Sequence, residues 1–325
     1  MKESNVNIFV TIGITCFNAE ETIEKAIDGA LEQDWENKEI IIVDDGSSDN
    51  SVLIVKKKIS NYKILFIKNS SNKGTSYSRN EIIKKAKGDL ICFMDDDDFS
   101  DSKRIRLQVN EFIKNGFPEV KNMACCAGLR KQYNNGYFKN YLPMGSLGKL
   151  PSGEELADFL LFYEKKRGID YGFALPTCSL MIAKYCFDKI GYFDLNLKRV
   201  EDMDMTIRLS MGNVKFLSVK EILVFQKANI FKAKSSKDNY NSEIYLIKKY
   251  QKYLSNKGLF DHAILWCELR FLYFKRNYIK CIFILFKLIA SNPKRTFIHF
   301  IQTSFKRLIH DFKNGSLLNP ILGKL

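Results

Sequence analysis

An apolar run followed directly by four aspartates constrains the fold of this chain more than any other feature. Residues 90–94 read Leu-Ile-Cys-Phe-Met, and residues 95–98 are all Asp. Buried strands of parallel sheets have continuous apolar sequences of this kind, and ligands of open α/β sheets bind beyond the carboxyl ends of the strands. We therefore expect these carboxylates at a ligand site in an α/β protein.

The four neighbouring carboxylates need a positive partner. Like charges in a row repel and raise one another's pKa unless a cation or several donors neutralise them. Because carboxylate oxygens suit Mg²⁺ and Mn²⁺, residues 95–98 predict a site for one of these cations that also holds phosphates. The alternative is a solvated acidic loop ahead of a helix that begins near Lys103.

Two other apolar runs also end in polar residues. Residues 38–43 lead into Asp44 and Asp45, and residues 9–14 lead into a polar turn at 15–18. Strand and helix patterns alternate from residue 9 to residue 115, which predicts a parallel, doubly wound sheet. Since parallel strands end at a shared edge, the three polar clusters should converge on one crevice.

The helix after the first strand carries an apparent start signal. Asn18 followed by Glu21 has the spacing of a capping box, so we predict a helix over residues 20–33 that Asn18 caps. Further helices are predicted near 75–86 and over 103–115.

The order and spacing of these motifs resemble those of the family 2 glycosyltransferases, over roughly residues 6–226. The matching motifs are Thr-Cys-Phe-Asn at 15–18, Asp-Asp-Gly-Ser-Ser-Asp at 44–49, Asn-Lys-Gly at 72–74, Ser-Arg-Asn at 78–80, the aspartates at 95–98, Gly-Tyr-Phe-Asp at 191–194 and Glu-Asp at 201–202.

The resemblance implies a GT-A fold, Rossmann-like with a mostly parallel central sheet. It also implies inverting transfer of a sugar, of the hexosyltransferase class, from a nucleotide diphosphate donor to an acceptor hydroxyl. Such chemistry needs a carboxylate to accept the hydroxyl proton and a cation to hold the departing diphosphate. The family pattern makes Asp202 the candidate general base, with Glu201 beside it on the acceptor side. Without the family pattern, these two residues read as the acidic first turn of a helix.

The family pattern also assigns the donor side. Asp97 would ligate the metal, Asp45 would hydrogen-bond the base, and the Phe17 ring would stack on it. The remaining donor-binding candidates are Thr15, Asn18, Arg79, Asp95 and Asp96. Arg79 has two interpretations, an organiser of ion pairs or a phosphate ligand.

Two departures from the family pattern leave alternatives open. Asp96 stands where the family has a small residue, so a register using Asp96 and Asp98 is an alternative to Asp97. The Arg and His that many members carry after the last strand are missing from residues 225–229; Lys227, Lys232 or Lys234 could contact phosphate instead.

Histidine and cysteine usage restricts the chemistry. The three histidines, His262, His299 and His310, all lie beyond residue 260, so acid/base or metal chemistry in residues 1–226 must use carboxylates. No ligand-like spacing joins them, and we expect them to be surface or packing residues. The eight cysteines form no CxxC motif and are expected to be reduced core residues.

The excess positive charge lies entirely in the C-terminal part of the chain. Residues 1–226 carry 32 basic and 32 acidic residues, whereas residues 227–325 carry 19 basic and 5 acidic residues, which accounts for the net charge of +14. We predict a glycosyltransferase domain over 1–226 and a basic helical tail over 227–325. Aromatic residues such as Trp266, Tyr273 and Phe274 lie beside basic ones in this tail, which is typical of helices that bind an anionic membrane surface. Packing alone and a nucleic-acid surface are the alternatives, but no nucleic-acid motif accompanies the charge.

We therefore expect a metal-dependent enzyme that glycosylates a lipid-linked glycan or cell-surface polysaccharide precursor. Its nucleotide-sugar donor and its glycan or glycolipid acceptor would meet at the cytoplasmic face of the cell membrane, since the N-terminus shows no export signal. The alternatives are a basic membrane- or nucleic-acid-binding protein with a degenerate nucleotide fold and, less favoured, a nucleotidyltransferase.

Overall fold

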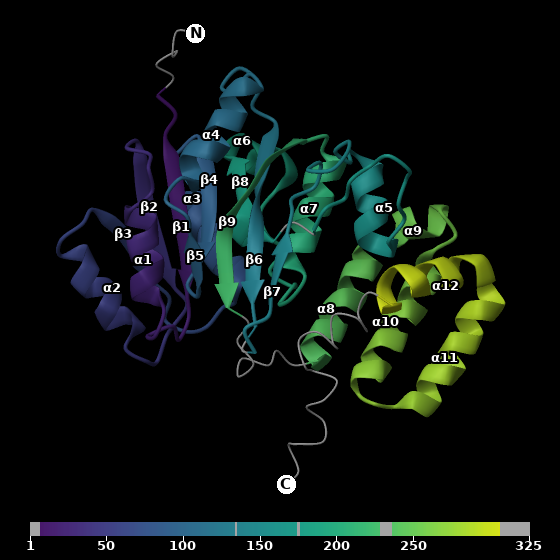
Figure 1. The fold of residues 1–325 in the computed structure, drawn as a ribbon. Helices are drawn as coiled ribbons and strands as arrows, with labels where there is room; N and C mark the ends of the chain where they lie inside the picture. The colour runs from purple at the N-terminus through teal and green to yellow at the C-terminus, as the bar shows by residue number, and fades with distance from the viewer. Residues whose placement is uncertain (1–6, 134, 174–175, 228–235, 306–325) are drawn as a thin grey trace.

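The computed structural model describes residues 7–133, 135–173, 176–227 and 236–305. Within these residues the strands form one curled sheet in the order β3-β2-β1-β4-β8-β6-β9-β5, with β7 paired to β6 (Figure 1). The strands are β1 Val10–Cys16, β2 Lys38–Asp44, β3 Ile64–Lys68, β4 Leu90–Asp95, β5 Asp98–Ser100, β6 Met123–Gln132, β7 Phe138–Tyr141, β8 Leu180–Ala183 and β9 Lys215–Lys227.

The predicted parallel half of the sheet is confirmed. β1 pairs in parallel with β2 and β4, and β2 pairs in parallel with β3. β8 then joins β4 and β6 in antiparallel pairing, whereas β6 and β9 run parallel. The apolar runs are buried as expected, with Ile12, Ile41 and Ile91 inaccessible to solvent. Full burial of each such side chain contributes roughly 1.5–3 kcal/mol.

Helices flank the sheet and connect its strands. Those of the first 226 residues are α1 Ile23–Leu31, α2 Ser51–Ile59, α3 Thr75–Lys85, α4 Arg104–Lys114, α5 Glu154–Phe162, α6 Lys184–Ile190 and α7 Glu201–Met211.

The capping box predicted for Asn18 and Glu21 is wrong. The helix begins three residues later than predicted, at Ile23, and its N-cap Thr22 makes no side-chain capping bond. Asn18 instead adopts a left-handed backbone conformation with φ of 48°. Its side chain is used by a neighbouring loop, because the Ser48 amide donates to Asn18 Oδ1 at 2.9 Å.

The C-terminal helices pack beside α5 and α7 at one side of the sheet (Figure 1). They are α8 Ser236–Lys249, α9 Gln251–Asn256, α10 Phe260–Phe274, α11 Tyr278–Ser291 and α12 Pro293–Phe300. The main core extends into this region as far as Cys267 on α10, whereas Trp266, Ile284 and Leu288 form a separate small cluster. No helix among the described residues is long and apolar enough to cross a bilayer.

The structure corrects one assignment in the tail and places the histidines and cysteines. Trp266, which the sequence placed among the membrane-facing aromatic residues, is only 5% exposed, whereas Tyr273 and Phe274 are exposed. His262 and His299 are buried and stack around Trp266, while His310 lies outside the described residues. All eight cysteines are free thiols, and seven of them are buried.

Candidate donor and acceptor site

The ends of three parallel strands lie side by side at one edge of the sheet. In the strand register, Cys16 is opposite Asp44 and Thr15 is opposite Asp95. The polar turns after β1, β2 and β4 therefore converge, as the alternating pattern predicted.

The turn after β1 is fixed on both sides. The Phe17 amide donates to Asp96 Oδ2 at 2.8 Å, and the Asn18 amide donates to Ser47 Oγ at 2.9 Å. The Phe17 side chain is 41% exposed, so its ring is accessible at the strand ends. An exposed aromatic ring held by a fixed backbone can stack on a nucleobase.

Asp45 organises the loop that leads into α3. Its carboxylate accepts hydrogen bonds from Asn69 Nδ2 at 2.8 Å, the Lys73 amide at 3.0 Å and the Gly74 amide at 2.7 Å. The residue is 3% exposed. A carboxylate has about four acceptor positions, so one position is left for a ligand.

The neighbouring glycine allows this arrangement. Gly46 has φ of +77°, and a Cβ atom at this position would lie 2.6 Å from the backbone of Ser71. A side chain here would push the 69–74 loop away from Asp45.

The four aspartates at the end of β4 lie in different surroundings. Asp95, Asp98 and Cys178 bring potential ligand atoms within 4.8 Å of one another, whereas Asp97 is exposed on the turn between β4 and β5. Gln226 Nε2 donates to Asp98 Oδ2 at 2.7 Å. Burial and the nearby Asp95 carboxylate raise the pKa of Asp98 to about 8.

The residues at this position fit a hard divalent cation. Two adjacent carboxylates form an anionic site whose charge a cation would neutralise, and carboxylate oxygens suit Mg²⁺ or Mn²⁺. Cys178 is a softer ligand; burial, followed by the Asp98 charge, raises the pKa of its thiol, which keeps it neutral. Lys227 ends β9, and Lys232 and Lys234 lie outside the described residues.

The first turn of α7 carries the two residues that the sequence predicts on the acceptor side. Glu201 and Asp202 begin this helix, and the Met203 amide donates to Asp202 Oδ1 at 2.8 Å. Burial, followed by the adjacent Glu201 charge, raises the pKa of Asp202 to about 6, although Arg79 opposes this shift. At neutral pH, Asp202 is therefore a carboxylate poised near the pKa range of a general base.

Arg79 joins the two candidate sides of the site through a pair of ionic contacts. Its Nη2 lies 3.2 Å from Asp95 Oδ1, and its Nη1 lies 2.9 Å from Glu201 Oε1. The side chain is 6% exposed, and its guanidinium carbon lies 5.5 Å from the centre of the Phe193 ring. These contacts are those of the ion-pair organiser, one of the two interpretations of this residue.

Asn80, the last residue of the Ser-Arg-Asn motif, contacts the backbone of the loop that leads into α7. Its side chain donates to the Phe193 carbonyl at 2.9 Å and accepts from the Phe193 amide at 2.8 Å. Ser76 Oγ donates to the Leu197 carbonyl at 3.2 Å. α3 therefore holds the loop that leads into α7, and a polar residue next to Arg79 in an otherwise helical segment was the available signal.

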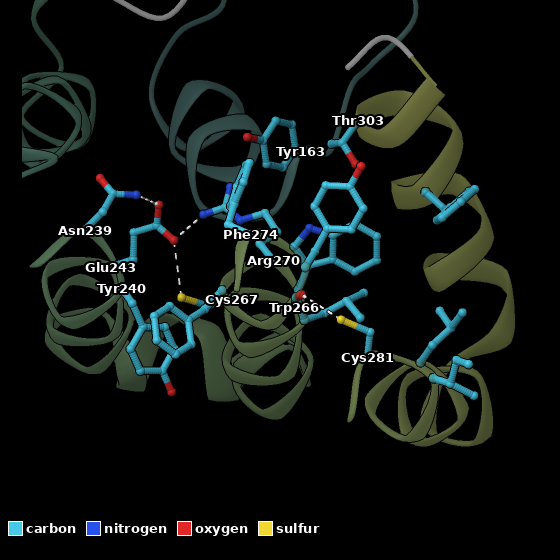
Figure 2. A pocket seen from close by; sticks show the side chains of 16 residues that line it. Tyr163, Asn239, Tyr240, Glu243, Trp266, Cys267, Arg270, Phe274, Cys281 and Thr303 are labelled. Carbon is cyan, nitrogen blue, oxygen red and sulfur yellow. Dashed lines mark hydrogen bonds and ion pairs between the residues drawn. The ribbon is translucent and has the colours of Figure 1, made fainter. Parts of the chain in front are cut away.

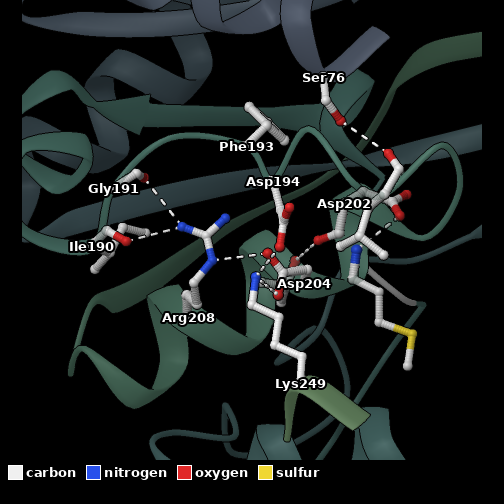
Figure 3. A network of polar contacts seen from close by, with 12 residues as sticks. Ser76, Ile190, Gly191, Phe193, Asp194, Asp202, Asp204, Arg208 and Lys249 are labelled. Atoms are coloured by element: carbon white, nitrogen blue, oxygen red, sulfur yellow. Dashed lines mark hydrogen bonds and ion pairs between the residues drawn. The ribbon is translucent and has the colours of Figure 1, made fainter. Parts of the chain in front are cut away.

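An ionic cluster around the buried Asp204 supports α7 on the side that contacts α8 (Figure 3). Asp204 is inaccessible to solvent and binds Arg208 Nε at 2.9 Å, Lys249 Nζ at 2.9 Å and Tyr250 OH at 3.0 Å. Lys249 also contacts Asp194 Oδ2 at 2.7 Å. The i,i+4 spacing of Asp204 and Arg208 is a local signal for one of these ion pairs, whereas the contact from α8 is non-local and has no such signal.

Replacing Arg79 by Met should destabilise the protein and raise the pKa of Asp202. Breaking a buried ion pair costs about 3–5 kcal/mol, and the partial exposure of Asp95 favours the lower value. The pKa of Asp202 should rise in this variant, because the positive charge of Arg79 lowers it. Denaturant unfolding and pH profiles test both effects. Lys84→Met, which breaks an exposed pair on the same helix, is the control and should change stability by less than about 1 kcal/mol.

Comparison with known proteins decides the family. The model of Glycosyl transferase family 2 matches residues 11–186, more than half of the chain. The chain belongs to this family. The matched region contains the strand ends and the donor-side residues, while α7 lies beyond it.

Curated relatives of this family member are bacterial transferases and synthases. The chain is 28% identical over 203 residues to the Escherichia coli UDP-Glc:alpha-D-GlcNAc-diphosphoundecaprenol beta-1,3-glucosyltransferase WfaP, covering 62% of this chain and 69% of that protein. It is 30% identical over 138 residues to the poly-beta-1,6-N-acetyl-D-glucosamine synthase of Staphylococcus aureus strain COL, covering 39% of this chain and 34% of the synthase.

Solved structures confirm the GT-A type of fold. S. aureus TarS residues 1–349 in complex with UDP-GlcNAc superimposes with a TM-score of 0.61 at 16% identity, covering 89% of this chain and 83% of that chain. The same protein in complex with UDP gives a TM-score of 0.59.

Proposed function

We propose that this glycosyltransferase is metal-dependent and inverting, and that it moves a hexosyl group from a UDP-sugar to a hydroxyl of a lipid-linked glycan precursor. A UDP donor is supported by two similar proteins, because WfaP is a UDP-Glc transferase and TarS has been solved with UDP and with UDP-GlcNAc. The lipid-linked acceptor is supported by the similarity to WfaP, which acts on a diphosphoundecaprenol-linked GlcNAc.

One observation carries this proposal. Arg79 bridges a donor-side carboxylate, Asp95, and an acceptor-side carboxylate, Glu201, so the two halves of a transfer site are adjacent. A binding protein that has lost catalytic activity would not need a partly buried carboxylate with a raised pKa, such as Asp202, next to Glu201. Family membership also favours a transferase over that alternative and over a nucleotidyltransferase.

On the donor side, the protein would fix the nucleotide at the strand ends. The Phe17 ring would stack on the base, and the remaining acceptor position of Asp45 would bind a base N–H, while Thr15 and Asn18 would shape the pocket. Asp95 and Asp98, or Asp97 in the family register, would hold the divalent cation, which offsets the charge that develops on the departing diphosphate.

On the acceptor side, Asp202 would remove the proton of the attacking hydroxyl. The hydroxyl oxygen attacks the anomeric carbon from the face opposite the diphosphate, so the configuration inverts as the bond to the diphosphate breaks. Glu201, held by Arg79, keeps negative charge beside Asp202 and thereby raises its affinity for that proton.

Activity should fall in acid. Because Asp202 must be ionised and its pKa is about 6, kcat/KM should be constant above this pH and should decrease about tenfold per pH unit below it. The measurement is UDP release at saturating cation over pH 4.5–8, with the melting temperature followed at each pH. A profile that stays flat down to pH 4.5 would contradict the assignment of Asp202.

A donor panel tests the proposed reaction directly. UDP-sugars are screened with Mn²⁺ by thermal shift, where a ligand at 100 times its Kd stabilises by about 2.7 kcal/mol. The best donor is then incubated with GlcNAc-diphosphate carrying a hydrocarbon chain. We expect UDP as the product; pyrophosphate would indicate nucleotidyl transfer instead, and binding without either product would indicate a non-catalytic protein.

The site of action is the last element of the proposal. The basic C-terminal helices would bring the enzyme to the anionic cytoplasmic face of the cell membrane, where lipid-linked acceptors are accessible. This is supported by the 19 basic against 5 acidic residues after residue 226.

A further inference from the structure

A cavity of about 570 Å³ lies among the C-terminal helices (Figure 2). Its walls come mainly from α8, α10 and α11, and none of its lining residues belongs to the donor and acceptor site. The volume is within the range of about 300–1,000 Å³ typical of small-molecule sites. Most of the lining is aromatic or aliphatic, including Tyr240, Trp266, Phe271, Phe274, Leu285 and Phe300.

The charged residues of the lining satisfy each other. Glu243 and Arg270, the two charged side chains among the described lining residues, form an ion pair. Asn239 Nδ2 also donates to Glu243 at 3.0 Å, and Cys267 Sγ lies 3.2 Å from it. With the charged pair satisfied, the remaining wall is mostly apolar and favours a guest without charge, although the buried Trp266 Nε1 is left without a hydrogen-bond partner.

An exposed apolar stripe of α11 borders the cavity. Ile282 lines the cavity and is 56% exposed, and it shares one helical face with other exposed apolar residues. These residues are Ile279, Phe283, Phe286 and Ile289, at the spacing of an amphipathic helix. Soluble proteins rarely expose contiguous apolar surface of this kind unless it binds something.

The charges around the stripe identify the partner. Residues 269–303 contain seven Lys and Arg and no Asp or Glu. Lys280 and Lys287 lie beside the stripe on α11 and are exposed. A second copy of the chain would present the same positive charge and be repelled, whereas an anionic lipid surface satisfies both the basic residues and the apolar stripe.

We propose that the α11 stripe inserts into the interface of an anionic bilayer and that one hydrocarbon chain of a membrane lipid enters the cavity. The inference rests on the proposed function in so far as that function places the enzyme at a membrane with a lipid-linked acceptor. It adds a lipid-chain site separate from the sugar-transfer site.

Trp266 provides the reporter for the cavity. The chain has two tryptophans, and Trp35→Phe leaves Trp266, which lines the cavity and is 5% exposed, as the sole fluorophore of this type. The full-length Trp35→Phe protein is mixed with phosphatidylglycerol vesicles whose acyl chains are brominated or unbrominated. We expect co-sedimentation with both and loss of most Trp266 fluorescence only with the brominated chains.

Three variants distinguish vesicle binding by the stripe from entry of a lipid chain into the cavity. Phe286 is 67% exposed, and Phe286→Ser should lose most vesicle binding. Leu53 on α2 is 65% exposed, and the control Leu53→Ser should bind like the parent. Lys287→Gln should weaken binding about fivefold. Cys281→Phe, which fills the cavity from α11, should co-sediment but lose the quenching. Circular dichroism verifies that each variant is folded.

Three results would overturn the inference. These are absence of binding to the anionic vesicles, binding without quenching of Trp266, and concentration-dependent dimerisation that Phe286→Ser abolishes. The vesicles contain neither donor nor acceptor, so these results do not depend on sugar transfer. UDP release with a GlcNAc-diphosphate that lacks a hydrocarbon chain tests the proposed function independently.

Discussion

Replacing Asp202 by Asn should lower the rate of sugar transfer by about 10²–10⁴-fold while leaving UDP affinity nearly unchanged. The amide keeps the shape of the side chain but cannot accept the proton of the acceptor hydroxyl. Single-turnover kinetics and titration with UDP measure the two quantities separately. A loss of less than about threefold in the transfer rate would remove Asp202 from the role of general base.

A second substitution on α7 distinguishes a loss of catalysis from a loss of stability. Asp204→Asn also preserves shape, but it removes a solvent-inaccessible charge that Arg208 and Lys249 neutralise. Unpairing buried charges costs about 3–5 kcal/mol, so this variant should unfold at lower temperature, whereas Asp202→Asn should melt near the parent. If both variants lose stability equally, the effect of Asp202→Asn on transfer would be structural.

Removal of divalent cations should abolish binding of the UDP-sugar donor. The carboxylates of residues 95–98 would otherwise repel a diphosphate, and a bound cation supplies several kcal/mol of charge stabilisation. Calorimetric titration with UDP in Mn²⁺ and in excess EDTA measures this difference. Full transfer activity in EDTA would show that the reaction proceeds without a metal.

Two variants of the acidic loop should identify the ligand. The family pattern assigns the metal ligand to Asp97, whereas the cluster of Asp98 with Asp95 and Cys178 favours Asp98 as the ligand. Asp97→Asn and Asp98→Asn are therefore compared directly. The variant that loses the Mn²⁺-dependent part of UDP binding has lost the ligand. Asp188→Asn, an exposed carboxylate on α6, is the control and should bind UDP like the parent.

The fold was predictable where a local pattern determines it. β1, β2 and β4 are continuous apolar runs buried on both faces, so their sequences specify parallel strands and their ends specify the edge at which polar turns meet. Asn18 was misjudged because its spacing to Glu21 satisfies a local rule, while the side chain is taken by the loop around Ser48. A long-range hydrogen bond outcompeted the local one.

The residues that hold the candidate site together were harder to predict than those that line it. Asn80 binds the backbone of Phe193, 113 positions away, and Lys249 reaches Asp204 from another helix. Neither contact has a spacing that a single sequence reveals, because tertiary packing alone brings these residues together. Trp266 was misplaced for the same reason, since its aromatic character suits an interface and an interior equally well.

The contact between α8 and Asp204 limits which C-terminal segments related enzymes can exchange. Because Lys249 and Tyr250 bind a residue of the acceptor helix, a chimera that exchanges everything after β9 would remove part of the support of α7. α11 contributes instead to the separate cluster with Trp266, so its outward face can change without disturbing that support. Junctions before α8 and after α10 would each break packed contacts, because Ile284 and Leu288 of α11 pack on Trp266 of α10. Diversification that keeps α7 in place is therefore expected on the exposed face of α11, by substitution and not by exchange of whole helices.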